Sequence, residues 1–286
     1  MFKHQYKVVI FILCALVAYL AWYTLEDNPP KQSFEKSIGT LLEVAGISQQ
    51  VAQFPALFKG SVEQNAQQGM VISLAQHQAI LNSIDSSVLP AEILAGISRA
   101  VKTAISQDEA EALMAWYQSP LGKKIVKAEE SAQSDQAYQQ MVAQKKRLLG
   151  NAERVAFAQR FNALLGAAVM TDKIQQNMQL AVNAMILQAL VPDRSPDIAA
   201  LKTQLQDADR QINPALEQMV VLSFVYSYQA LSNEELIKYE RFLSDPPTIK
   251  FNKIIMSGIN SGLEDAILRW LDTTAVVLAK LEEDET

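Results

Sequence analysis

Few residues of this 286-residue chain have the types and spacing that catalysis or metal binding requires. Of its two histidines only His77 lies outside the N-terminal segment, and the single cysteine, Cys14, lies within it. A metal site would need His77 together with carboxylates, and no H-x-x-x-H cluster occurs. His77 falls between Leu74 and Ile80 at helical spacing, which favours a partly buried structural histidine. We therefore expect no metal and no other cofactor.

Paired carboxylates are the remaining candidates for acid-base chemistry. Asp108-Glu109 and Glu234-Glu235 stand where the first turn of a helix is expected, and there negative charge stabilises the helix dipole. Gly122-Lys123-Lys124 lacks the earlier glycine and the Ser/Thr of a phosphate-binding loop, and no G-x-S-x-G elbow is present. We predict a protein that is not an enzyme, and a carboxylate-dependent hydrolase is the least favoured alternative.

The acidic pairs belong to a pattern that occurs twice, 126 residues apart. In each copy a serine precedes a glutamate by three positions, which is the capping box that starts a helix. An aromatic residue follows, and then an N-cap residue stands directly before a proline that suits the first turn of a second helix. The matched positions are Ser106, Glu109, Trp116, Ser119, Pro120 and Lys124 in the first copy and Ser232, Glu235, Phe242, Asp245, Pro246 and Lys250 in the second. Each copy predicts a helix, an abrupt corner and another helix.

Weaker similarity extends upstream of both corners. Leu41-Leu42 matches Leu164-Leu165 at an offset of 123, and Leu89-Pro90 matches Asn213-Pro214 at 124. We favour duplication over a chance recurrence of capped hairpins, with a first repeat over 34–150 and a diverged second repeat over 151–286.

Between these landmarks apolar residues follow helical spacing. The segment 219–228, MVVLSFVYSY, is apolar nearly all round, and we interpret it as a buried central helix rather than a strand. The fold class predicted is all-α, with two tandem helical-bundle repeats that pack together.

A membrane anchor is predicted at the N-terminus. Residues 8–25 carry no charge and would extend about 27 Å as a helix, which can span a bilayer. Lys3 and Lys7 precede them, so the positive-inside rule places the N-terminus in the cytoplasm and residues 26–286 on the outer side of the membrane. The expected organisation is therefore an anchor over 1–25 and a proline-containing linker over 26–33; a cleaved signal peptide is the alternative.

Charge limits the classes of partner. Lys3 and Lys7 are the only charged residues before position 26, so 23 of the 25 basic residues and all 31 acidic residues follow, which gives a net charge of −8. Nucleic acid is therefore an unfavourable partner. Five methionines of the second half could line a groove for an apolar ligand or a partner helix, although methionines more often fill cores. They are Met170, Met178, Met185, Met219 and Met256.

The first corner resembles a known family. The stretch QDEAEALMAWYQSPLGKKI resembles the bacterial domain of unknown function 2059, in which a capped acidic helix leads to an aromatic pair and a Ser-Pro-x-Gly-Lys corner. The matching positions are Trp116, Tyr117, Ser119, Pro120, Gly122 and Lys123 or Lys124. The second copy departs from the motif at Leu243, Asp245 and Thr248. The resemblance implies an exported all-α protein and supplies no activity.

Three functions follow as hypotheses. The first is a membrane-tethered, non-catalytic module that scaffolds or recruits a protein partner. The second is a binder of lipid or another apolar small molecule between helices, and the third is the hydrolase named above.

Overall fold

The structure is a computed structural model that describes residues 34–67, 72–132, 134–190, 197, 200, 203 and 213–285. Within these residues every regular element is a helix and no strand is present, which confirms the all-α prediction. The predicted anchor and linker lie outside the described residues.

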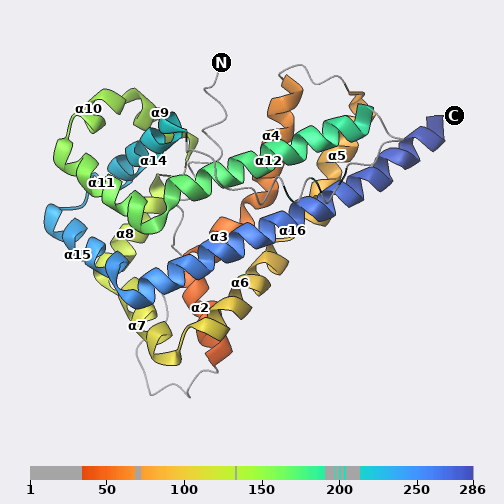
Figure 1. Cartoon of the computed structure of the whole chain (residues 1–286). Helices are drawn as coiled ribbons and strands as arrows, with labels where there is room; N and C mark the ends of the chain where they lie inside the picture. Colours follow the sequence, from red (N-terminus) through yellow and green to blue (C-terminus); the bar gives the residue numbers. More distant parts are fainter. Residues whose placement is uncertain are drawn as a thin grey trace.

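Helices follow one another closely along the chain (Figure 1). The first half contains α2 (Phe34–Val44), α3 (Ile47–Ala52), α4 (Phe54–Gln67), α5 (Leu74–Ser87), α6 (Pro90–Ala104), α7 (Gln107–Gln118), α8 (Pro120–Ser131), α9 (Asp135–Ala143) and α10 (Lys145–Leu149). The second half contains α11 (Ala152–Leu165), α12 (Ala167–Leu190), α14 (Pro214–Ser227), α15 (Asn233–Ser244) and α16 (Pro246–Glu285). Gly150 and Asn151 separate α10 from α11, as the sequence predicts.

The predicted helix starts are confirmed. Ser106 and Ser232 are the N-caps of α7 and α15, and each forms a complete capping box. The amide of Ser106 donates to the Glu109 carboxylate at 2.7 Å, and the amide of Ser232 donates to Glu235 at 2.8 Å. These bonds satisfy amides that the helix itself leaves without a partner, so the local sequence sets where both helices begin.

The long helix α16 lies at the centre of the packing. It crosses the molecule with α12 and α6 on either side, and it also packs against α5 (Figure 1). Trp270 of α16 is fully buried and meets the ring of Phe58 edge-on, with 5.4 Å between centroids. Its indole N–H donates to the Ser83 hydroxyl at 2.9 Å, and Ser83 is 2.7 Å from the Thr274 hydroxyl. Halves of the chain that are distant in sequence therefore share one core.

The apolar segment 219–228 lies in and just after α14, and Val220 to Tyr228 are all buried. This confirms the prediction of a buried helix over a strand. A helix with apolar side chains on every face needs neighbours on every side, and α14 obtains them from α8, α9, α10, α11 and α12.

One helical stretch of the described chain, Leu74–Ala104, has the length and composition of a membrane span. It consists of α5 and α6 in succession, and both helices pack against α16. Core helices of proteins without a membrane span meet the same length and composition criteria, and 39% of the most apolar window of this stretch is buried inside the protein.

Candidate functional site: the groove between α6 and α16

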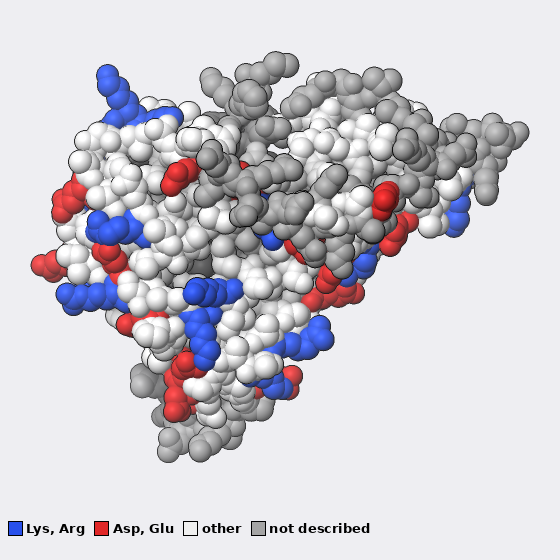
Figure 2. Space-filling model, in the orientation of Figure 1, with Lys and Arg blue, Asp and Glu red and all other residues white. Residues whose placement is uncertain are grey.

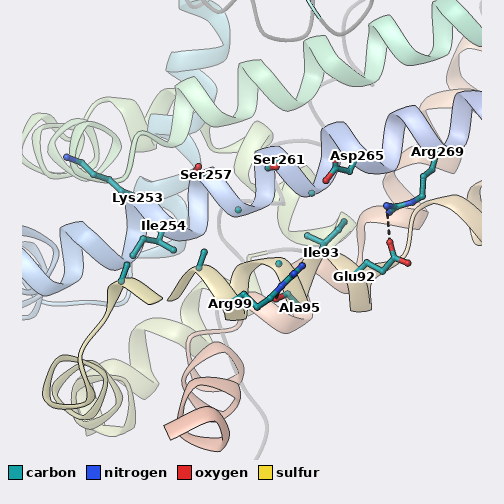
Figure 3. Close-up of a pocket in the computed structure, with 15 residues that line it drawn as sticks. Glu92, Ile93, Ala95, Arg99, Lys253, Ile254, Ser257, Ser261, Asp265 and Arg269 are labelled. Carbon is teal, nitrogen blue, oxygen red and sulfur yellow. Dashed lines mark hydrogen bonds and ion pairs between the residues drawn. The ribbon is translucent and has the colours of Figure 1, made fainter. Parts of the chain in front are cut away.

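A groove with a volume of about 810 Å³ runs between α6 and α16 (Figure 3). Small residues form much of its surface, and several are exposed, so the groove is open to solvent. Those that line it are Ala95, Gly96, Ala100 and Ala104 from α6 and Ser257, Gly258, Ser261 and Gly262 from α16. Volumes of this size are typical of ligand pockets in proteins.

Two glycines of α16 bring the helices together beneath the groove. A Cβ atom at Gly258 would lie 2.7 Å from Cγ1 of Ile97, and one at Gly262 would lie 2.8 Å from Cγ2 of Ile93. Real Cβ atoms essentially never approach so closely, so the absence of side chains is required here. Ile93 and Ile97 are buried against α16 and hold α6 in place.

Charged side chains surround the small ones. Arg269 pairs with Glu92 at 2.9 Å across one end of the groove, as Figure 3 shows. Arg99, Lys253 and Asp265 also line it, and none of these three forms an ion pair within the described chain. The groove therefore offers two unpaired cations and one unpaired anion to a ligand.

The corner motifs lie elsewhere, at the contact between the two halves. The indole of Trp116 stacks on the ring of Phe242. Lys124 of α8 binds Glu235 at 2.7 Å, and Lys250 of α16 binds Glu109 at 3.0 Å. The structure thus brings the two corner motifs together, although they are 126 residues apart in sequence.

Glu109 and Glu235 each accept a hydrogen bond from the N-cap amide of their own helix and form an ion pair with a lysine of the other corner. The backbone amide of Ser106, and next Lys250, hold the pKa of the Glu109 carboxyl below its usual range. For Glu235 the larger cause of the lowered pKa is Lys124, followed by the amide of Ser232. Each of these two carboxylates therefore holds a helix start and a contact with the other corner.

The first corner is tight. The Ser119 hydroxyl accepts a hydrogen bond from the Gly122 amide at 3.0 Å, and Pro120 begins α8. A Cβ atom at Gly122 would lie 2.3 Å from the carbonyl oxygen of Trp116, so this position requires glycine. At the second corner Pro246 begins α16, and the buried Thr248 stands at the equivalent position. The second corner therefore has room for a side chain.

A buried cluster of one glutamate and two tyrosines was not predicted from the sequence. Glu129 of α8 is buried and accepts hydrogen bonds from the hydroxyls of Tyr228 at 2.5 Å and Tyr239 at 3.2 Å. Gly122, Ile125, Val126 and Glu129 are the buried residues of α8, and their helical spacing places the carboxyl on the apolar face. That spacing was the available signal.

The five methionines that could line an apolar groove lie in or against the core of the described chain. Met170, Met178 and Met185 are buried in the main core, while Met219 and Met256 are half-buried against it. None of them lines the groove between α6 and α16.

His77 is half-buried on α5, and its Nε2 atom is buried with no hydrogen-bond partner in the described part of the chain. No group of three His, Cys, Asp or Glu residues suited to a metal ion occurs among the described residues.

The first corner lies within a segment that matches a known protein family. Residues 102–147 match the family described as "Uncharacterized protein conserved in bacteria (DUF2059)". The match extends from the end of α6 into α10 and includes the first corner once. No curated protein and no solved structure matches the chain.

Proposed function

We propose that this protein is a membrane-tethered, non-catalytic interaction module that binds a helical segment of a partner protein in the groove between α6 and α16. The observation that carries the proposal is the open groove of about 810 Å³, with its small side chains and unpaired charges.

Small side chains support a helical occupant. Gly96, Ala100 and Ala104 recur every four residues along α6, and Ser257 and Ser261 do so along α16, so each row lies along one face of its helix. Rows of small residues let a further helix approach closely enough for its backbone and side chains to pack. The partner segment would lie along the groove.

Charge supports a partner with carboxylates. Arg99 and Lys253 are exposed and unpaired within the described chain, whereas Arg269 is neutralised by Glu92. On the face drawn in Figure 2 the described acidic and basic side chains are interspersed rather than gathered into a basic patch. With Asp265 the only unpaired anion among the described residues that line the groove, the two cations leave a local positive excess, which favours Asp or Glu side chains on the docking helix.

We also propose that the second half is a diverged copy of the first. Supporting this, Glu109–Lys250 and Lys124–Glu235 are the same pair exchanged between copies, as expected for a self-complementary two-fold contact. The proposed equivalent helices also occur in the same order along the chain: α2, α3, α6, α7 and α8 in the first half, and α11, α12, α14, α15 and α16 in the second.

The upstream register is better described by an offset of 120 than of 123. Gly46 and Gly166 both adopt left-handed conformations at a helix boundary, with φ of 69° and 61°. Residues matched at this offset are buried on both sides: Ile38 with Ala158, Leu41 with Phe161, and Leu42 with Asn162. Leu164 and Leu165, the matches expected at 123, are only half-buried.

Tethering rests on the sequence of residues 8–25. We propose that this segment stays in the inner membrane with residues 26–286 in the periplasm. Membrane fractionation, protease protection and N-terminal sequencing of the mature chain test it. Recovery in the soluble periplasmic fraction with a cleaved N-terminus would instead establish the secreted alternative.

Site-specific photo-cross-linking in the cells that naturally produce the protein tests the groove. A benzophenone amino acid at Ala100, which is exposed on the groove wall, is compared with the same substitution at Ala112, exposed on α7 outside it. We expect an adduct at position 100 and none at position 112. The cross-linked peptide should be helix-forming and carry Asp or Glu.

Two variants make the test specific. Ser261→Trp fills the groove, and Arg99→Glu reverses one of its charges; each should lower the adduct at least about fivefold, the equivalent of roughly 1 kcal/mol. Equal adducts at positions 100 and 112, or an adduct unchanged by both variants, would rule out docking in this groove.

A further inference from the structure

We propose that Glu129, Tyr228 and Tyr239 form a pH-responsive latch, in which the neutral Glu129 carboxyl holds α8 against α14 and α15 and its ionisation releases α8. This inference goes beyond partner binding and does not depend on the groove.

The latch joins three helices through one oxygen atom. Glu129 lies on α8, Tyr228 directly follows α14, and Tyr239 lies on α15. Oε1 of Glu129 accepts hydrogen bonds from the Tyr228 hydroxyl at 2.5 Å and from the Tyr239 hydroxyl at 3.2 Å. Glu129 is only 4% exposed, and both tyrosines are buried. The rings of Phe161 and Phe224 lie against Tyr228, so the surroundings are apolar.

No cation compensates an ionised Glu129. The charged and titratable groups around it are Tyr117 from α7, the neighbouring Glu130 and the two tyrosines. Arg154 of α11 donates to the backbone carbonyl oxygens of Tyr228 and Leu231. Within the described chain Glu129 forms no ion pair, so its charged form is stabilised by phenol hydroxyls alone.

The equivalent place in the other half holds no carboxyl. Ile255 lies 126 residues after Glu129 and is 5% exposed, and Leu113 lies 126 residues before Tyr239 and is 2% exposed. Their helices, α16 and α7, pack against each other. The corresponding positions thus hold buried hydrocarbon side chains, and buried polar groups are often no more stabilising than such replacements. Packing does not require Glu129, which points to a role in regulation.

The sign of the response follows from proton linkage. Burial raises the pKa of the Glu129 carboxyl from 4.5 to about 8, against the opposing effect of the two tyrosine hydrogen bonds. In the released state the carboxyl titrates near its ordinary value, so the closed state binds the extra proton between these two pH values. The latch is therefore fully closed at low pH and weakens as pH rises to about 8.

Release would act locally. Besides the latch, α8 is held to the second half by its packing on α14 and by the exposed Lys124–Glu235 pair. A pocket of about 300 Å³ lies between the C-terminal part of α8 and the end of α14, and Lys127, Ser131 and Ser227 are among the residues that line it. Opening the latch would widen this pocket, whereas the core around Trp270 has no part in it.

Hydrogen exchange of the full chain in detergent micelles, corrected for intrinsic rates, tests the latch between pH 6 and pH 9. The opening constant of α8 amides should rise by up to about tenfold per pH unit as far as pH 8, while α5 amides change little. Glu129→Gln should remove the rise, and Glu130→Gln, the adjacent control, should retain it.

A second variant and a second measurement keep the outcome decisive. Glu129→Ile reproduces the apolar residue of the other half and should also abolish the pH dependence if Glu129→Gln does not fold. Infrared spectroscopy at pH 7 should show a protonated-carboxyl band that either variant lacks. The latch is refuted if wild type and variant open alike at every pH, or if that band is missing from the wild type.

Discussion

The indole of Trp116 lies flat on the ring of Phe242, with 3.6 Å between the ring centroids and 3° between the planes. Tyr117 meets Phe242 edge-on at 5.5 Å, so one aromatic ring from the second corner contacts both aromatics of the first. This contact joins the two halves of the chain at their matching corners.

We expect Trp116→Ala to destabilise the protein by about 2–4 kcal/mol, because a half-buried aromatic loses both its packing and its stacked partner. Trp116→Phe should recover more than half of that loss. Urea unfolding of the full chain in micelles measures it, and Ile237→Ala on the exposed face of α15 serves as control. A loss at position 116 no larger than at 237 would show that the stacking does not stabilise the join.

At acidic pH we expect stability to depend on Glu109 and Glu235. Their pKa values are lowered in the folded state, so their contribution is present above the ordinary pKa of 4.5 and is lost as pH falls through the lower folded value. The double variant Glu109→Gln/Glu235→Gln should flatten the acid limb of a plot of melting temperature against pH. The neighbouring Glu234→Gln should leave that limb steep; a double variant with an unchanged limb contradicts this assignment.

Gly122→Ala should cost roughly 1–3 kcal/mol, because the added methyl meets the Trp116 carbonyl at 2.3 Å and the corner must open. Gly39→Ala is the matched control: nothing lies within 4 Å of its Cβ, and alanine in a helix interior should stabilise by about 0.5–1 kcal/mol. Opposite signs in thermal unfolding are the expected result. Two equal effects would mean that the first corner is not sterically restricted.

Ser83→Ala should destabilise by about 1–3 kcal/mol, because it leaves the buried indole N–H of Trp270 and the hydroxyl of Thr274 without their mutual partner. Thr274→Val should cost less, since the bond from Trp270 to Ser83 survives. Denaturant unfolding gives the two values, and near-ultraviolet circular dichroism reports whether Trp270 stays ordered. The reverse ranking would assign the key contact to Thr274.

Local signals in the sequence located the helix ends. Capping boxes and N-cap–proline pairs involve residues three positions apart or adjacent, so they can be recognised without knowing the fold. The buried stripe of α16 was equally visible, because helical spacing aligns Ile259, Leu263, Ile267, Trp270 and Leu271.

Contacts between distant segments could not be predicted in this way. The close approach of α6 and α16 beneath the groove depends on Gly258 and Gly262, which admit Ile97 and Ile93 from 161 and 169 residues earlier in the chain. Glu129 meets tyrosines that lie 99 and 110 residues away. The upstream match at an offset of 123 rests on a repeated Leu-Leu pair, and no local signal in the sequence distinguishes it from the offset of 120 that we propose from burial.

The single helix α16 has a mechanical consequence. Its 40 residues extend about 60 Å, whereas α8, which follows the first corner as α16 follows the second, has 12 residues. Along this length it contacts α5 and α6 from the first half and α12 and α15 from the second. Tension applied by a partner held between Ser257 and Asp265 would therefore be shared by both halves at once, and pulling the partner away would load the whole molecule rather than a single hairpin.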